Sequence, residues 1–465
     1  MSSSTSDSSS NTTHDNMFNK PSEPNYVGKV RNVYYPKELN SVIILEHTDK
    51  LSAYDSHICN VNGKGNLLNL TNVFWMNNTK HIVPNHYISH DDSYILAKKT
   101  NPIKIEFIVR GYITGASKTS LWTLYEENRH GVYGITLPEG LTKHQKLVEP
   151  VITPTTKGDI DIPIDENYII NNNLLTKAQW DFISSKAKAL YQFGYDYCLT
   201  KGLILVDTKY EFGIDSNGHI MLIDECHTCD SSRYWMADTY QSNLDNGKDP
   251  QSIDKDQIRR YINKEYPDFK NLPLLDRPDV IIPEEVKTQL FSSYAFLLNT
   301  LTSNLVSEPV KFTESSNDSN YKSILQNYYD NEAPRVIIMS GSISDAPKVN
   351  KVADFCRENG LVSKIYYHSA HKEPKVVLEL IEQLNGQIAT GRKMVIIAVV
   401  GMSNALGGVL GANMLCPVIN CPMFADRVDM MVNIHSNIQM PSRVPVATIL
   451  SDRNAVLFAR KVLFL

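Results

Sequence analysis

The chain has 465 residues, a length that corresponds to about three domains with sizeable hydrophobic cores. Its charged residues (21%) and hydrophobic residues (42%) occur in the proportions of an ordinary globular protein, and the formal net charge of −5 argues against broad, charge-driven binding to nucleic acid. No apolar run approaches the ~18 residues that a membrane span requires. We therefore expect neither nucleic acid nor a membrane as a partner, whereas local basic pockets for phosphorylated metabolites remain compatible with this composition.

The seven cysteines are odd in number and scattered along the chain, which indicates a reducing compartment rather than a disulfide-stapled fold. Cys226 and Cys229 flank His227 in a CxxC pair, but no second pair exists to complete a zinc site, so we do not expect a structural metal there. The serine-rich segment 1–25 lacks the apolar stretch of a secretory signal. We expect a disordered tail and a cytoplasmic protein.

The first ordered elements are expected near residue 26. Segment 26–35 has the pattern of two strands joined by a glycine turn, and segment 41–47 that of the next strand. Gly28 and Lys29 in this turn suit the covering of nucleotide phosphates, because the backbone can approach closely and the ammonium adds positive charge. A plain hairpin turn is the alternative interpretation.

A polar loop, 48–55, follows, and Gly63 to Leu68 then leads into an apolar helix. Either this is an ordinary loop with a helix anchor, or Ser52, Asp55 and Lys64 bind substrate and phosphate.

Segment 103–113 predicts a buried strand that contains Glu106 and Arg110. A buried arginine needs a partner, and Glu106 is the candidate on the same strand. The proline-containing segments 149–157 and 165–167 are expected to be polar connecting loops, and 176–201 has the apolar spacing of a core helix.

The most informative stretch is a predicted hairpin, with strands 203–214 and 219–225 around a turn at 215–218. Alternate residues of a strand share a face, so Asp207, Lys209 and Glu211 point the same way. If the four turn residues form the loop, Lys209 lies opposite Asp224 and Glu211 lies opposite Leu222, which brings Asp224 to the same face. Three carboxylates around a lysine are costly to bury unless a divalent cation and phosphates join them.

The alternative for this hairpin is the solvated face of an ordinary amphipathic element. Just beyond it, Asp230, Ser232 and Arg233 suit an anionic substrate. A final helix is predicted at 284–301, followed by a polar linker, 302–332, with a short helix near 321–329.

From residue 333 the pattern changes to strands that alternate with helices, with strands at 335–339, 363–368, 394–400 and 417–422. This alternation predicts a parallel sheet, whose ligands bind beyond the carboxyl ends of the strands. The loops after the first three strands contain the polar residues Ser342, Ser344, Asp345, Ser369, His371, Lys372, Ser403 and Asn404. His371 is a candidate acid or base near neutral pH, and Lys372 a candidate cation for a carboxylate or carbon dioxide. A generic doubly wound domain with its site elsewhere is the alternative.

Several segments between residues 26 and 301 together resemble the SAICAR synthetase family. They read GKVRNVYY, TDKLSAYD, VRGYITG, VDTKYEFG and DSSRYW. The resemblance implies an α+β ATP-binding domain that uses Mg²⁺ and ATP to join L-aspartate to carboxyaminoimidazole ribotide (CAIR).

The resemblance also implies residue roles. Lys209 would stabilise the transferring phosphoryl group, and Glu211 and Asp224 would hold Mg²⁺. The expected nucleotide-binding residues are Gly28, Lys29, Lys64, Glu106, Glu211 and Asp224. The expected substrate-binding residues are Ser52, Asp55, Arg110, Ser117, Asp207, Asp230, Ser232, Arg233 and Arg259.

The three loops of the second half, together with QMPSRVPVAT at 439–448, resemble the AIR carboxylase family from residue 335 onward. This resemblance implies a three-layer α/β/α domain that carboxylates aminoimidazole ribotide (AIR). The segment GMSN at 401–404 is similar to the class that uses carbon dioxide directly, although Met402 stands where that class often has arginine. His371 would remove the C4 proton. Lys372 would be the second catalytic residue of this domain. The expected substrate-binding residues are Ser342, Ser344, Asp345, Ser369, Ala370, Ser403 and Asn404.

The combined resemblance implies an α/β bifunctional purine-pathway enzyme whose small-molecule partners are AIR, CO₂, CAIR and L-aspartate. It also implies a homo-oligomer, an octamer. The expected divisions are a tail (1–25), a synthetase domain (26–305), a linker (306–332) and a carboxylase domain (333–465). The alternatives are a mutase-class second domain, a second domain that serves only assembly, and a different ATP-dependent transferase or small-molecule kinase.

Overall fold

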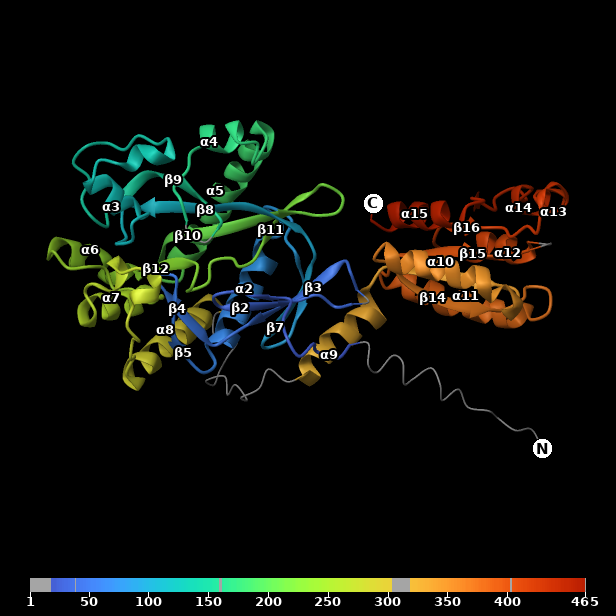
Figure 1. Cartoon of the computed structure of the whole chain (residues 1–465), viewed down its shortest axis with the longest axis horizontal. Coiled ribbons are helices and arrows are strands. Elements are labelled where there is room, and N and C mark those ends of the chain that lie inside the picture. Colours follow the sequence, from blue (N-terminus) through green and yellow to red (C-terminus); the bar gives the residue numbers. More distant parts are fainter. Residues whose placement is uncertain (1–17, 38, 159–160, 303–317, 402–403, 465) are drawn as a thin grey trace. The chain divides into compact units, whose positions relative to one another are not determined.

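A computed structural model describes residues 18–37, 39–158, 161–302, 318–401 and 404–464 of the chain. The chain divides into two compact units, and Figure 1 shows their elements. The N-terminal unit contains residues 22–34 and the chain from 44 to the end of helix α8, at 302. The C-terminal unit contains residues 18–21, 35–43 and everything described from 318 onward. The chain therefore passes between the units more than once.

Antiparallel strands form the framework of the N-terminal unit. In one sheet the order is β1-β2-β3-β7-β6, in the second it is β11-β10-β8-β9 with β12 also paired to β10, and β4 pairs with β5. The strands are β1 Tyr26–Val27, β2 Arg31–Tyr34, β3 Val42–His47, β4 Lys50–Ala53, β5 Ser56–Asn60, β6 Tyr87–His90, β7 Tyr94–Lys98, β8 Asn101–Tyr112, β9 Lys146–Thr156, β10 Leu203–Ile214, β11 Ile220–Ile223 and β12 Ser232–Met236. The helices are α2 Lys64–Thr79, α3 Leu121–Glu126, α4 Glu166–Asn171, α5 Lys177–Leu199, α6 Ala237–Asp245, α7 Asp256–Glu265 and α8 Glu284–Thr302.

Helix α5 supports the second sheet at the strands that hold the site. It begins with a capping box between Thr176 and Gln179. Its Tyr191 hydroxyl donates to the Leu205 carbonyl of β10 at 2.9 Å. A Cβ on Gly111 of β8 would lie 1.9 Å from the Tyr191 Oη atom, so only glycine permits this approach. The contact fixes β8 next to Arg110.

The C-terminal unit contains a parallel sheet in the order β14-β13-β15-β16-β17. Its strands are β13 Arg335–Ser340, β14 Val362–Tyr367, β15 Met394–Ala398, β16 Val418–Asn420 and β17 Ala447–Thr448. Its helices are α9 Asp318–Asn327, α10 Ala346–Glu358, α11 Pro374–Ala389, α12 Ala405–Asn413, α13 Arg427–Asn433, α14 His435–Ile438 and α15 Asp452–Leu463. Alternate residues of β13 point to opposite faces, with Val336 and Ile338 toward α10 and α15, and Ile337 and Met339 toward α11 and α12. The predicted three-layer α/β/α architecture is confirmed.

The short helix predicted near 321–329 is present as α9, and a π-helical turn, Tyr328–Glu332, follows it before β13. Phe18, which we expected in the tail, is 1% exposed and its ring lies 5.4 Å from that of Tyr329. Residues 1–17 and 303–317 lie outside the described residues.

The expectation of a connecting loop at 149–157 is wrong, because this segment is most of β9. In the described residues no helix is long and apolar enough to cross a membrane. All seven cysteines are free thiols, and Cys226 and Cys229 are buried.

Candidate active site

A cluster of charged side chains lies where β8 and β10 pair. Glu211 is directly opposite Glu106 in the register, an arrangement that like charges disfavour unless a cation lies between them. Lys209 Nζ supplies that cation, at 2.8 Å from Glu106 Oε1 and 2.7 Å from Glu211 Oε1. Lys157, just beyond β9, binds the other oxygen of Glu211. We call Glu106, Lys157, Lys209 and Glu211 the lysine–carboxylate cluster.

Asp224 lies near this cluster, but the strand register and the backbone conformation that place it there differ from the predicted ones. The expected pairing of Glu211 with Leu222 is wrong by one residue, since Glu211 lies opposite Ile223. A strand continued in that register would turn Asp224 to the other face. Instead β11 ends at Ile223 and Asp224 adopts a left-handed conformation with φ 67°. Its carboxylate then forms an ion pair with Arg31 Nη2 at 2.7 Å.

The two acidic residues expected to hold a metal have opposite electrostatic behaviour. Burial pushes the pKa of Glu211 upward, but Lys209 and Lys157 outweigh it and hold the pKa well below its usual range. Burial raises the pKa of Asp224 to about 6, with Glu211 adding to the rise and Arg31 opposing it. Asp224 is therefore a carboxylate that a further cation would stabilise in its charged form.

The chemistry of this pair fits Mg²⁺. Among the described residues no group of three or more His, Cys, Asp or Glu side chains is arranged as a complete metal site. Mg²⁺ does not need such a group of side chains, because it is commonly held by one or two carboxylates together with substrate phosphates and water. Glu211 and Asp224 supply two carboxylates whose mutual repulsion is already expressed in the raised pKa of Asp224.

Two arginines share one carboxylate at the other end of β10. Asp207 is opposite Arg110 of β8 on one side and Arg233 of β12 on the other. Its Oδ2 atom lies 3.5 Å from Arg110 Nη1 and 2.5 Å from Arg233 Nη1. The expected pairing of Arg110 with Glu106 is therefore wrong. Arg233 Nε also lies 3.7 Å from Asp256 Oδ1. The geometry of the two guanidinium groups suits a phosphate or carboxylate.

A third charged group is buried beneath the β4–β5 hairpin. Asp230 Oδ2 lies 2.9 Å from Lys64 Nζ and 3.5 Å from Lys255 Nζ, and Asp230 Oδ1 accepts from the Tyr294 hydroxyl at 2.6 Å. We call Lys64, Asp230 and Lys255 the lysine–aspartate triad. Lys64 was expected to contact nucleotide phosphates, but its side chain is 1% exposed and its ammonium is bonded inside the protein. Lys64 and Asp230 thus stabilise the floor of the site.

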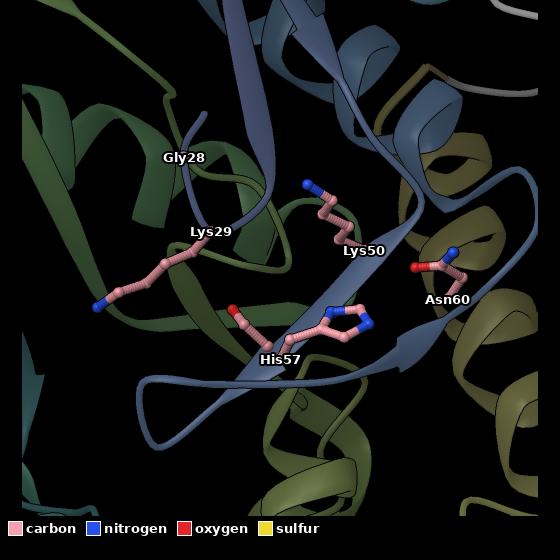
Figure 2. Close-up of a pocket in the computed structure, with 6 residues that line it drawn as sticks. Gly28, Lys29, Lys50, His57 and Asn60 are labelled. Atoms are coloured by element: carbon pink, nitrogen blue, oxygen red, sulfur yellow. The ribbon is translucent and has the colours of Figure 1, made fainter. Parts of the chain in front are cut away.

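A cavity of about 440 Å³ lies beside the hairpin. Gly28 forms the tight turn above it, and a Cβ there would be 2.8 Å from the Arg31 carbonyl oxygen. Lys29 Nζ forms an ion pair with Asp55 at 2.5 Å. The lining residues, shown in Figure 2, are Gly28, Lys29, Lys50, Ser52, His57 and Asn60.

The remaining predicted residues of this unit have local partners. Ser232 Oγ donates to Thr208 Oγ1 at 2.8 Å and is buried. Arg259 Nη1 lies 3.4 Å from Asp256, which also faces Arg233. The Ser117 carbonyl accepts from the Ser120 hydroxyl at 2.7 Å and shapes the loop after β8.

In the C-terminal unit, the three predicted loops follow β13, β14 and β15, which are neighbours in the sheet. Parallel strands bring these loops to one edge. In the first loop, Ser340 Oγ donates to Asp345 Oδ2 at 2.5 Å and Ser344 Oγ donates to Ser342 Oγ at 2.8 Å. In the second, Lys372 N donates to Ser369 Oγ at 3.3 Å.

His371 and Lys372 are exposed, and Ala370 beside them is half-buried. In the third loop Asn404 is buried, its Oδ1 accepts from Gly407 N at 2.7 Å, and its Nδ2 donates to Asn437 at 2.6 Å. Both ends of this amide therefore help to shape the loop. Met402 and Ser403 lie outside the described residues.

Sequence reasoning missed Lys157, Arg31 and the placement of Lys255 next to Asp230. Arg31 is two residues after Lys29, in the turn already expected to face phosphates, and Lys157 ends a segment taken for a loop. Their partners are remote in sequence, so only the strand pairing reveals them.

The lysine–carboxylate cluster and the arginine pair, both on β10, together form a charged site of the kind that suits anionic ligands. Comparison with known proteins identifies the family. The model for SAICAR synthetase matches residues 24–272, and the model for AIR carboxylase matches residues 335–465. The chain belongs to the SAICAR synthetase family and carries an AIR carboxylase-family domain fused to it.

Individual relatives agree with this assignment. The chain is 40% identical over 306 residues to the chloroplastic phosphoribosylaminoimidazole-succinocarboxamide synthase of Arabidopsis thaliana, covering 64% of this chain and 72% of that protein. It is 47% identical over 259 residues to the synthase of Legionella pneumophila (strain Lens), covering 55% and 82%. A solved SAICAR-synthase from Saccharomyces cerevisiae, complexed with SAICAR, matches with a TM-score of 0.52 and 29% identity, covering 61% of this chain and 96% of that one.

Proposed function

We propose that the chain catalyses two consecutive steps of purine biosynthesis. The C-terminal unit carboxylates AIR with carbon dioxide to give CAIR. The N-terminal unit then joins CAIR to L-aspartate with ATP, giving SAICAR, ADP and phosphate. The lysine–carboxylate cluster carries the second assignment, because it brings two lysines and two carboxylates together inside the region that matches SAICAR synthetase.

In the ligase reaction, a carboxylate oxygen of CAIR attacks the γ-phosphorus of ATP, so that an acyl phosphate forms and ADP leaves. The amine nitrogen of aspartate then attacks the acyl carbon, and the bond to phosphate breaks. Negative charge accumulates on the phosphoryl oxygens in the first step. Lys209 and Lys157 stabilise it from positions that the buried Glu211 carboxylate fixes, one lysine on each of its oxygens.

Glu211 and Asp224 would hold the Mg²⁺ ion that accompanies ATP, and the ion would offset the charge of the triphosphate. Lys209 keeps Glu211 ionised, and Arg31 holds Asp224 in place. Gly28 and Lys29 would lie over the phosphates, since glycine permits the tight turn and the Lys29 ammonium adds positive charge. The remaining ligands of the Mg²⁺ ion would come from the substrates.

Arg110 and Arg233 are proposed to bind the phosphate of the ribotide. Asp207 fixes both guanidinium groups, and Thr153 Oγ1 orients Arg110 by accepting from its Nε atom at 2.8 Å. The SAICAR bound in the Saccharomyces cerevisiae enzyme carries a ribotide of this kind, which supports an anion site in the same fold.

In the carboxylase reaction, C4 of the AIR ring attacks carbon dioxide, and the C4 proton then leaves. We assign the proton's removal to His371 and the stabilisation of the new carboxylate to Lys372, both of which follow β14 at the carboxyl edge. Ser342, Ser344 and Asp345 would bind the ribotide, and Asn404 would set the shape of the loop that carries Ser403. The GMSN loop is the feature that favours carbon dioxide over an N-carboxylated substrate.

A coupled assay tests the proposal. Purified full-length protein with AIR, bicarbonate, L-aspartate and Mg-ATP should yield SAICAR, ADP and phosphate in equal amounts. ADP formation should require both aspartate and CAIR, or AIR with bicarbonate. A different ATP-dependent transferase would instead release ADP without one of these compounds.

A further inference from the structure

His144 joins two loops that are distant in the sequence. Its Nδ1 atom lies 2.9 Å from Thr114 Oγ1, in the loop after β8, and its Nε2 atom lies 2.8 Å from Asp249 Oδ1, in the loop after α6. An ionised carboxylate only accepts hydrogen bonds, so Nε2 donates to Asp249. In a neutral ring Nδ1 is then the acceptor, and the Thr114 hydroxyl donates to it. We call Thr114, His144 and Asp249 the histidine bridge.

The surroundings of this ring favour its neutral form. Burial lowers the pKa of His144, and the charges of Lys143 and Arg260 add to this effect, whereas Asp249 opposes it. The ring also makes a T-shaped contact with Trp235 of β12, with 5.4 Å between the ring centres. Both nitrogen atoms therefore have protein partners, and the ring fixes the distance between the two loops.

The backbone of His144 is held in place as well. Its N–H donates to the Ile113 carbonyl at 2.6 Å, and its carbonyl accepts from the Tyr240 hydroxyl at 2.8 Å. The residue has a left-handed conformation with φ 71°, which histidine and asparagine both tolerate better than most residues. The side chain thus starts from a fixed point next to the end of β8.

The loop that carries Thr114 contacts both arginines of the proposed phosphate site. A Cβ on Gly115, which has φ 102°, would lie 3.3 Å from Arg233 Nη2. Further along the loop, the Thr119 carbonyl accepts from Arg110 Nη2 at 3.3 Å. The position of this loop therefore affects the orientation of both guanidinium groups.

We propose that His144 is a positioning residue for the phosphate of the ribotide. Through Thr114 it holds the loop 114–120 against the Arg110–Arg233 pair, so that both guanidinium groups are oriented before the ribotide binds. The inference rests on the proposed ligase function, in which this pair binds the phosphate, and adds a residue that acts through its neighbours.

The test uses the full-length protein supplied with CAIR, L-aspartate and Mg-ATP. Thr114→Val removes the hydroxyl donor. His144→Gln places its amide toward Asp249, as Nε2 does, whereas His144→Asn places its amide near the position of Nδ1, beside Thr114. His219→Asn is the matched control, because His219 Nδ1 lies 3.3 Å from Asp215 Oδ2 on the exposed turn between β10 and β11. The melting temperature of every variant is measured alongside.

Thr114→Val and His144→Gln should each raise the KM for CAIR about fivefold or more, because a displaced guanidinium group weakens a charge-assisted hydrogen bond to the phosphate. The dissociation constant of ribose 5-phosphate, measured by direct titration, should rise by the same factor. His144→Asn and His219→Asn should leave both constants within about twofold of wild type. The KM for ATP should be unchanged in all four variants.

A lower melting temperature of Thr114→Val and His144→Gln with unchanged constants for CAIR and ribose 5-phosphate would overturn the inference, since the histidine bridge would then stabilise only the fold. An equal rise in the KM for ATP would overturn it too. A wild-type protein that forms no SAICAR from CAIR would contradict the ligase function, and the titration with ribose 5-phosphate would still decide whether His144 orients the phosphate site.

Discussion

Lys209 and Glu211 are two residues apart on β10, and the lysine Nζ lies 2.7 Å from the Glu211 Oε1 atom. Glu211 is buried and Lys209 is half-buried, and Lys209 Nζ also lies 2.8 Å from Glu106 Oε1 of β8. The ammonium keeps Glu211 ionised in spite of its burial, so the site retains a negative charge before any substrate binds.

That retained charge leads to a prediction about the proposed metal ligands. Glu211→Gln and Asp224→Asn should each lower the ligase kcat about 100-fold or more, since each removes charge that offsets the cation at the reacting phosphates. Carboxylation of AIR should continue at the wild-type rate. Separate assays of SAICAR formed from CAIR and of CAIR formed from AIR measure the two effects, and near-normal ligation in both variants would disprove the metal assignment.

The raised pKa of Asp224 predicts a pH dependence. Its folded-state pKa of about 6 lies above the ordinary carboxyl value, so the protein holds a proton there below pH 6 that must leave before a cation can bind. Ligase activity at low Mg²⁺ concentration should therefore fall as the pH drops through about 6. Higher Mg²⁺ concentrations should move the midpoint to lower pH, because the cation stabilises the ionised form. A midpoint that does not respond to Mg²⁺ would point to a different group.

The same shift has a consequence for stability. Between the ordinary carboxyl pKa and about pH 6 the folded chain binds more protons at Asp224 than the unfolded chain does. The contribution of this residue to the free energy of unfolding thus decreases as the pH rises through that window, and bound Mg²⁺ should reverse the loss.

The boundary of the C-terminal unit predicts how fragments behave. Arg335 and Arg392 are buried, and both donate to the Tyr329 carbonyl, at 2.6 and 2.8 Å. A fragment that begins at Asn331 lacks this acceptor and leaves two buried guanidinium groups with fewer partners. It should be less stable than a fragment that begins at Asp318 by about 2 kcal/mol or more. Chemical denaturation of both fragments measures the difference, and equal stabilities would show that the turn at 328–332 is dispensable.

The choice between carboxylase classes is also testable. Under bicarbonate-free conditions the protein should not convert N-carboxylated AIR to CAIR, whereas AIR with carbon dioxide should be converted efficiently. His371→Asn should remove this activity while leaving ribotide binding intact, because the imidazole's task is to take the C4 proton. Efficient conversion of only the N-carboxylated compound would place the domain in the mutase class.

Several features of the site follow from local pattern alone. The apolar and β-branched composition of 203–214 predicted β10 with its observed bounds, and the alternation of side chains along a strand predicted the shared face of Lys209 and Glu211. The α/β alternation after residue 333 predicted the parallel sheet and the meeting of its loops, because these depend on rules of chain connection rather than on particular contacts.

The errors have a common origin in contacts between distant segments. The face of the hairpin on which the Asp224 side chain lies depends on where β11 ends and on the left-handed backbone conformation of Asp224 itself. The length of the turn alone specifies neither. Arg110 pairs with Asp207 because β8 and β10 are neighbours. Pro150 and Pro154 suggested a loop, yet β9 is at the edge of its sheet, where proline is tolerated.

The most direct test of two separate sites in one chain compares Lys209→Met with His371→Asn in the presence of either AIR plus bicarbonate or CAIR. Each reaction also contains L-aspartate and Mg-ATP, and CAIR and SAICAR are quantified. Lys209→Met should make CAIR from AIR but no SAICAR from either compound. His371→Asn should make SAICAR from CAIR at the wild-type rate and none from AIR. Loss of both activities in one variant, or SAICAR formed from AIR by His371→Asn, would contradict two separate sites.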